Sequence, residues 1–410
     1  MGIERRKKVD SKDQVTFKRI PEFDVIKGIG MLVVMIFHIV YRTRGGIADN
    51  IIRASLIAVI AGYFVISGLL HGVERRTIIG EYINKFKHLV LPTVVVTFVA
   101  SVFGGIYCHI VHGMSVSAWI RNIVYIYLRP ELSVKVVGDM DPIKDMVFLD
   151  LSTTWFAWTL IIAYIVFIPL SKLILKSQAL SIAATVAMFV LGNIIYVNVG
   201  SSPWNASLVP LYVSAMLLVQ HLKYENIVAK IRKMNIVASI TSTIAAMFAM
   251  FGMYFYILDD HMYEAQLGVF HLLKFKHWSY PYGYAKVNPL VEYKGLIWIE
   301  GTCHILAGLI CLYVGINIAR YIRKIRGASK LLEYIGKNSL YVMILHSLIA
   351  LPFVDLLHCI NKMGAKWYLD DLTPEITIKS IICAILSLVC CLIICRAKDT
   401  IYPKIKKGGR

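Results

Sequence analysis

The chain has 410 residues, of which 58 % are hydrophobic and only 17 % are charged. A soluble protein of this size could not enclose so much apolar surface in one core, so the composition excludes a soluble globular protein and indicates a membrane protein. Lys and Arg number 44 against 25 Asp and Glu, which gives a formal net charge of +19. The basic residues gather in the loops on one side of the predicted spans, so we attribute the charge to membrane topology and expect no nucleic-acid partner.

Ten apolar stretches are long enough, at roughly 17 to 25 residues, to cross a bilayer as helices. In chain order they cover residues 23–42, 52–71, 88–108, 153–171, 178–199, 204–222, 235–258, 296–319, 334–356 and 376–395. With both termini in the cytoplasm, the short loops on that side carry the surplus of Lys and Arg, as insertion into the membrane requires. The predicted fold is therefore an all-α polytopic membrane protein with about ten transmembrane helices and cytoplasmic N- and C-termini.

Three segments follow from this topology. Residues 1–22 form a basic cytoplasmic segment, residues 23–395 the ten-helix membrane domain, and residues 396–410 a basic cytoplasmic tail. The first segment has no apolar centre and no small-residue cleavage site, so we expect no removable signal peptide.

The first span, "DVIKGIGMLVVMIFHIVYR", carries a lysine near one end and a histidine near the other. His38 follows Lys27 by eleven positions, which is three helical turns plus about 20°, so both lie on one face, on the order of 16 Å apart along the axis. Lys27 either extends to the cytoplasmic headgroups or has a functional role. His38 lies deeper and has no local partner, which favours function. Asp24, one turn before Lys27, is its predicted ion partner or a helix-start carboxylate.

Two outer segments, residues 109–152 and 259–295, are long enough to lie along the membrane interface as partial helices. For the first, "SVSAWIRNIVYIYLRP", we favour an aromatic anchor. For the second, rich in aromatic, basic and histidine residues, an anchor and a rim that holds a sugar both remain open.

Spans eight and nine contain further ionisable residues. Glu300 and His304 are spaced i, i+4, so the carboxylate can orient the imidazole and raise its basicity, as a general base requires. A structural link between helices is the alternative. His346 lies near the middle of span nine, and the alternative to a catalytic role is a packing histidine.

Four stretches, in order along nearly the whole chain, resemble the acyltransferase-3 family of integral membrane acyltransferases. They are "FDVIKGIGMLVVMIFH", in which Lys27 and His38 fit the family's spacing, "YFVISGLLHG" at 63–72, "WFAWTLIIAYIVFIPL" from Trp155 and "LLEYIGKNSLYVMILHSLI" from Leu331. Where the family commonly has an Arg-x-x-Arg pair, "KFKHLVLP" offers Lys85 and His88. The positive charge is kept there, but the bidentate fork of arginine is not.

The resemblance implies an acyl-CoA donor, with acetyl-CoA favoured, on the cytoplasmic side and a glycan or lipid-linked glycan acceptor on the outer side. His38, with Glu300, His304 and His346, is the catalytic candidate set. The candidates for donor binding share a place near the cytoplasmic mouth: Lys27, Ser67, Arg75, Arg76, Lys85 and His88. No metal is expected, because the spacing of the cysteines resembles neither a zinc site nor a disulfide framework.

The resemblance further implies a polysaccharide O-acetyltransferase-like enzyme of a bacterial plasma (inner) membrane, alongside possible polysaccharide-assembly proteins. Many relatives carry an SGNH-type hydrolase domain after the last span, and we expect none here. Two alternatives remain: a glycan exporter without acyl-transfer chemistry, and a receptor or assembly subunit. The absence of obvious repeats and the spacing of Lys27 and His38 disfavour export, and the histidines within the spans disfavour a receptor.

Overall fold

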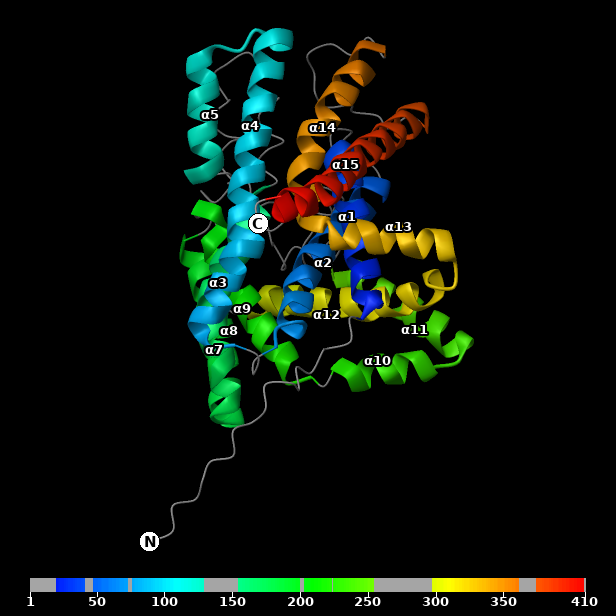
Figure 1. The fold of residues 1–410 in the computed structure, drawn as a ribbon. Coiled ribbons are helices and arrows are strands. Elements are labelled where there is room, and N and C mark those ends of the chain that lie inside the picture. The colour runs from blue at the N-terminus through cyan, green and yellow to red at the C-terminus, as the bar shows by residue number, and fades with distance from the viewer. Residues whose placement is uncertain are drawn as a thin grey trace, which may run out of the picture.

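The computed structural model describes residues 20–40, 47–72, 76–128, 154–199, 203–222, 224–253, 297–360 and 374–408, and these ranges are helical with short connections and no strand. The helices, shown in Figure 1, are α1 (Pro21–Val40), α2 (Ile47–Leu69), α3 (Ile78–Lys85), the π-helical η1 (Phe86–Val90), α4 (Leu91–His112), α5 (Val116–Leu128), α7 (Trp155–Ser171), α8 (Gln178–Val199), α9 (Val209–Gln220), α10 (Tyr224–Lys233), α11 (Ile236–Met253), α12 (Ile297–Ile322), α13 (Arg326–Lys337), α14 (Ser339–Ile360) and α15 (Pro374–Gly408). The short η4 (Lys172–Leu175) and η5 (Pro203–Leu208) are 3-10 helices.

Length and apolar composition mark five described stretches as able to cross a membrane: Ile78–Val111, Trp155–Leu175, Gln178–Ile195, Ile305–Ile322 and Ile381–Ile401. Shorter apolar helices cover Ala58–Leu69, Ala206–Gln220 and Ile236–Gly252. The all-α polytopic membrane fold is thus confirmed. A helix occupies each of the ten stretches expected to span, and the count of ten membrane crossings stays a prediction.

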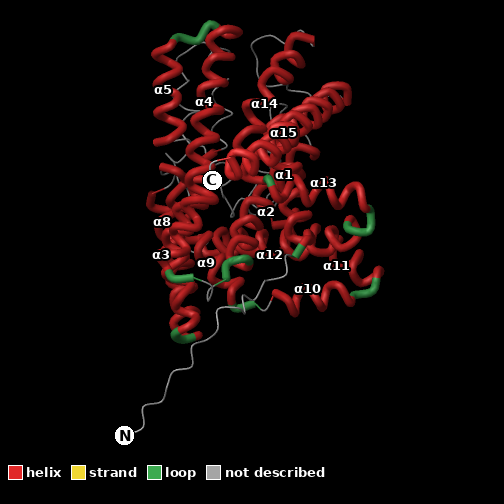
Figure 2. The backbone as a smooth tube through the Cα atoms, in the orientation of Figure 1, coloured by secondary structure: helices red, strands yellow, loops and turns green. Residues whose placement is uncertain are grey.

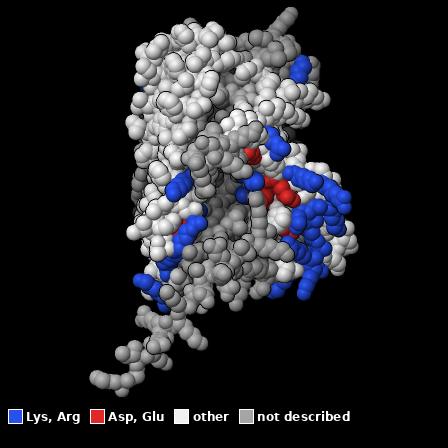
Figure 3. Space-filling model, viewed as in Figure 1, with Lys and Arg blue, Asp and Glu red and all other residues white. Residues whose placement is uncertain are grey.

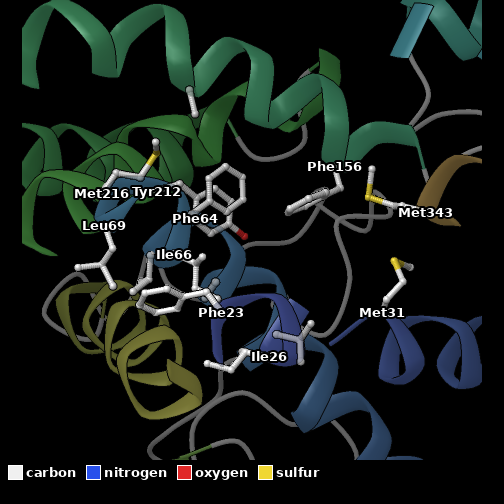
Figure 4. Close-up of a cluster of buried hydrophobic side chains, with 14 of the residues drawn as sticks. Phe23, Ile26, Met31, Phe64, Ile66, Leu69, Phe156, Tyr212, Met216 and Met343 are labelled. Carbon is white, nitrogen blue, oxygen red and sulfur yellow. The ribbon is translucent and has the colours of Figure 1, made fainter. Parts of the chain in front are cut away.

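The first helix, α1, occupies a central position. It packs against α2, α12, α13, α14 and α15, and Figure 1 shows these helices around it. The buried side chains of α1 join a core that continues through α2 into α9 and α7 (Figure 4). In that core the rings of Phe64 and Tyr212 stack with their centroids 3.9 Å apart, and Phe156 meets Phe64 edge-on. The helix that carries Lys27 and His38 is therefore held on several sides.

Two glycines bring α1 and α13 into direct backbone contact. A Cβ placed on Gly336 would lie 1.8 Å from the carbonyl oxygen of Asp24, and one on Gly28 would lie 2.2 Å from the carbonyl oxygen of Leu332. Only a residue without a side chain fits at either position. The glycine in "LLEYIGKNSL" is therefore a packing residue for the first helix.

The ninth predicted span, 334–356, begins too early. The chain forms α13 up to Lys337, breaks at Asn338 (φ −102°, ψ 15°) and starts α14 at Ser339. The amide side chain of Asn338 accepts a hydrogen bond from the Lys398 ammonium of α15, at 2.8 Å. The polar residues Lys337, Asn338 and Ser339 mark this break in the sequence, but the predicted span ran across them because both flanks are apolar.

The first outer segment, expected as a partial helix along the membrane interface, forms α5, which pairs with α4 in a hairpin. Figure 2 shows α5 running back beside α4 after a short loop. Gly113 ends α4 in the left-handed conformation (φ 67°), and the indole of Trp119 lies against Gly105 and donates to the Ser101 carbonyl at 3.2 Å. Gly105 leaves room for the indole, which lets the two helices pack together. The second outer segment, 259–295, lies outside the described residues.

Candidate functional site

The start of α1 places a lysine beside a buried carboxylate. The Lys27 ammonium lies 2.9 Å from the Asp24 carboxylate, and their side chains are 22 % and 8 % exposed. The Tyr63 hydroxyl of α2 donates a 2.7 Å hydrogen bond to the Lys27 carbonyl oxygen. The ion pair predicted from the i, i+3 spacing is confirmed. Lys27 therefore has a local partner, and a phosphate bound there would compete with Asp24 or share the ammonium with it.

A second carboxylate at this end of α1 was not recognised in the sequence. Glu22, 3 % exposed, accepts hydrogen bonds from Arg232 of α10 and from Arg323, just after α12, both at 2.6 Å. Burial by itself would raise the pKa of the Glu22 carboxyl, but the hydrogen bond from Arg232 and the charges of both arginines outweigh burial and lower the pKa. The only sign of this pairing in the sequence was the position of Glu22, an acidic residue directly before the first span in an otherwise basic segment.

Replacing Glu22 with Gln should lower the thermal unfolding midpoint at pH 7, with a loss of about 1–2 kcal/mol of stability, since both arginines are partly exposed. A carboxyl whose pKa is lowered by folding stabilises the protein above its unfolded pKa, and this contribution disappears as the pH falls through the folded pKa. The difference between wild type and Glu22→Gln should therefore shrink as the pH falls below 4.5. Unfolding followed at several pH values in detergent, with Glu333→Gln as control, measures it. A difference that does not change with pH would contradict the charge pairing.

For three of the catalytic candidates the structure describes the helical backbone but not the side chain. His38 belongs to the last turn of α1, and Glu300 and His304 belong to the first third of α12. The helical backbone of α12 keeps Glu300 and His304 one turn apart, as the spacing predicts. Their side chains lie outside the described residues, so the catalytic roles of all three stay predictions.

His346 is the catalytic candidate whose side chain is described. It is fully buried in α14, which packs against α1. Its Nδ1 lies 3.1 Å from the Val342 carbonyl oxygen, one turn earlier in the same helix, so the tautomer with a proton on Nδ1 can donate there. This bond fixes the ring relative to its own helix.

The donor-binding candidates of α3 and η1 gather at one end of α7. The Lys85 ammonium lies 3.7 Å from the centroid of the Tyr164 ring, a cation–π contact. Lys172 donates to the Arg76 carbonyl oxygen at 2.7 Å, and Arg76 and His88 are exposed. Ser67 is half-buried in α2, and Arg75 lies outside the described residues. This end of the protein can attract an anion through exposed charge.

Besides single basic side chains, Figure 3 shows two larger groups on this face, one over the end of α7 and the other, which is larger, over α10 and the ends of α12 and α13. We call the larger group the α12 basic group, which comprises Lys230, Arg232, Lys233, Arg320, Arg323, Lys324, Arg326 and Lys330. Within the described ranges no contact joins Lys27 to Lys85. The α12 basic group is thus a second basic surface that the sequence analysis did not identify, and the donor-binding role of the predicted set stays a prediction.

The described residues contain no cluster of His, Cys, Asp or Glu that could hold a metal ion. The arrangement therefore offers histidine on membrane helices and positive charge at their ends. Proton transfer and anion binding are the chemistry that such side chains can perform.

The helices and this distribution of charge define the class: a polytopic helical membrane protein with ionisable residues on its central helix. A family model described as an acyltransferase domain matches residues 20–396. The chain therefore belongs to the acyltransferase-3 family and is a membrane acyltransferase. The comparison with curated proteins found no match, and the comparison with solved structures found none either.

Proposed function

We propose that the protein transfers an acyl group, acetyl by the family resemblance, from acyl-CoA on the cytoplasmic side to a hydroxyl of an extracytoplasmic glycan. The observation that carries this proposal is the family match over residues 20–396, which includes α1 with both Lys27 and His38. A bacterial plasma membrane, a lipid-linked form of the acceptor and neighbouring polysaccharide-assembly proteins belong to the same proposal.

In the proposed reaction the acceptor hydroxyl oxygen attacks the thioester carbonyl carbon. A C–O bond forms, the C–S bond breaks, and the hydroxyl proton moves through His38 to the departing thiolate of CoA. A covalent variant first places the acyl group on the His38 ring and then on the acceptor. Glu300, His304 and His346 are candidates to orient or relay this proton.

The phosphates of the donor need positive charge at the cytoplasmic end. Lys27, Ser67, Arg75, Arg76, Lys85 and His88 remain the candidate set. The support is the exposure of Arg76 and His88 and the partial exposure of Lys27. Because Lys85 lies on the Tyr164 ring, a phosphate bound there would have to meet an ammonium already in contact with an aromatic face.

Incubating the purified protein with radiolabelled acetyl-CoA and candidate glycans tests the proposal. Label that appears in the glycan and needs His38 supports acyl transfer. Glycan that crosses a vesicle membrane without acquiring label supports the exporter instead and contradicts the proposal.

Replacing Lys27 with Gln should raise KM for the acyl-CoA donor by about ten- to a hundredfold, because a charge-assisted contact to phosphate contributes roughly 1.5–3 kcal/mol. Lys27→Arg, which keeps the charge beside Asp24, should retain most of the donor affinity. The measurement is the initial rate against donor concentration at equal amounts of inserted protein. An unchanged KM for Lys27→Gln would assign the lysine to its ion pair alone.

A further inference from the structure

An apolar cavity of about 220 Å³ lies between α1, α2, α11 and α12. Its walls include Ile29 and Val33 of α1, Val59 of α2, Met247 and Phe251 of α11, and Val314 of α12. Among the described residues that line it, Lys27 is the only charged one. The cavity therefore combines hydrocarbon walls with one ammonium group near the cytoplasmic end of α1.

The cavity lies behind α1 with respect to the proposed reaction. Position 29 precedes position 38 by nine residues, which is two and a half helical turns, so the two positions face opposite sides of the helix. Lys27 lies on the same face as position 38, and its side chain also lines the cavity. The part of the cavity at Ile29 thus faces away from His38, and Lys27 lies between the two.

The walls suit a hydrocarbon chain. The amides of a pantetheine arm or the hydroxyls of a sugar would lose hydrogen bonds to water in this space and gain few in return. An apolar cavity of roughly 150 Å³ is enough to hold benzene, so by that measure this one holds about nine carbon atoms. That is part of one alkyl tail.

An exposed apolar surface lies next to the cavity. Helix α11 forms one of the cavity walls through Met247 and Phe251, while the adjoining face of α11 exposes Ile240, Ile244 and Phe248 by 49 %, 49 % and 73 %. In a membrane protein such a face contacts the bilayer. One apolar helix thus separates the cavity from hydrocarbon.

The cytoplasmic end of the cavity leads to positive charge. On α12 Tyr321 follows the lining residue Val314 by seven positions, so both lie on one face of the helix. Within the described part of the chain, the buried Tyr321 hydroxyl has no hydrogen-bond partner. The Arg320 guanidinium and the Lys324 ammonium lie 5.3 and 5.2 Å from the centroid of the Tyr321 ring.

Charge complementarity identifies the occupant. Two members of the α12 basic group, Arg320 and Lys324, lie against the Tyr321 ring, and basic pockets between membrane helices on the cytoplasmic side bind anionic headgroups. We propose that the cavity and the α12 basic group form a site for an anionic phospholipid of the cytoplasmic leaflet, with one acyl tail between α1 and α11 and the headgroup phosphate at the exposed Lys324, beside the Tyr321 ring. The test of this site measures lipid binding, so its result does not depend on whether the proposed acyl transfer is correct.

The test is native mass spectrometry of the full-length protein in mild detergent, after addition of phosphatidylglycerol or of phosphatidylcholine with the same tails. The wild type should retain phosphatidylglycerol at least tenfold better. Met247→Trp, which puts an indole into the cavity, should reduce retention of both lipids at least tenfold. Ala245→Trp, the same new side chain at an exposed position about 160° around α11 from Met247, should leave retention unchanged. Lys324→Gln should remove the preference for phosphatidylglycerol.

Size-exclusion chromatography and the unfolding midpoint show whether each variant is folded. If Met247→Trp does not fold, Val314→Phe fills the same cavity from α12, and Leu306→Phe, at an exposed position of α12, is its control. The proposal is overturned if the wild type retains neither lipid. It is also overturned if the cavity-filling variants bind lipid as well as their controls do. Displacement of phosphatidylglycerol by octanoyl-CoA also overturns it and assigns the cavity to the donor.

Discussion

His38→Ala should lose acyl transfer by a factor of roughly 10² to 10⁴, the range that general-base assistance supplies. The protein should still insert and accumulate, because α1 is held by packing along its length with α2, α12, α13, α14 and α15. The rate of label transfer from acetyl-CoA to glycan, at matched protein, is the measurement. His109→Ala is the control, since His109 is an exposed histidine near the end of α4.

The rest of the candidate set makes this result more specific. If Glu300 orients His304 for proton transfer, Glu300→Gln should lower the maximal rate and leave KM for acyl-CoA unchanged, because the carboxylate does not touch the donor phosphates in the proposal. Near-normal product from His38→Ala would end the catalytic assignment of this residue. Loss in His38→Ala together with equal loss in His109→Ala would show a general effect of histidine removal.

Gly336→Ala should abolish accumulation of folded protein or lower its unfolding midpoint by more than any other single substitution considered for this chain. The added Cβ would lie 1.8 Å from the Asp24 carbonyl oxygen, so α13 has to move away from α1. Gly28 faces the same contact from the other side, with a Cβ position 2.2 Å from the Leu332 carbonyl oxygen. Backbone cannot yield as a flexible side chain can, which makes the expected effect large.

Gly327→Ala is the matched control, because Gly327 lies on the same helix and a Cβ there meets nothing within 4 Å. Because alanine has a higher helix propensity than glycine, this substitution should leave the stability of α13 unchanged or raise it by up to about 1 kcal/mol. Expression, monodispersity and the unfolding midpoint in detergent measure both variants. Gly336→Ala that behaves like Gly327→Ala would contradict the close contact of α1 and α13.

Hydropathy predicted most of the helical fold, because a bilayer demands long apolar helices whatever their neighbours are. It failed at the break at Asn338, because the predicted span ran across the polar residues Lys337, Asn338 and Ser339. There the Asn338 amide oxygen accepts a hydrogen bond from Lys398, on a helix distant in sequence. It also missed that α5 returns along α4, since the space for Trp119 depends on Gly105 of the preceding helix.

The candidate site divides in the same way. The pair of Asp24 and Lys27 follows from spacing within one helix, and the structure confirms it. Glu22 with Arg232 and Arg323 joins residues 210 and 301 positions apart, and no local pattern connects them. The grouping of basic residues into two surfaces likewise depends on where helix ends meet.

By itself, the sequence determined the class of protein, the positions of most apolar helices and the ion pair at the start of α1. These depend on hydropathy and on spacings within a single helix, which each segment carries alone. Only the tertiary structure decided that two glycines join α1 to α13, that Glu22 binds two arginines, and that a hydrocarbon-lined cavity lies behind α1. Each of these features is formed by residues from segments that are distant in sequence, and only the packing of the helices brings those residues together.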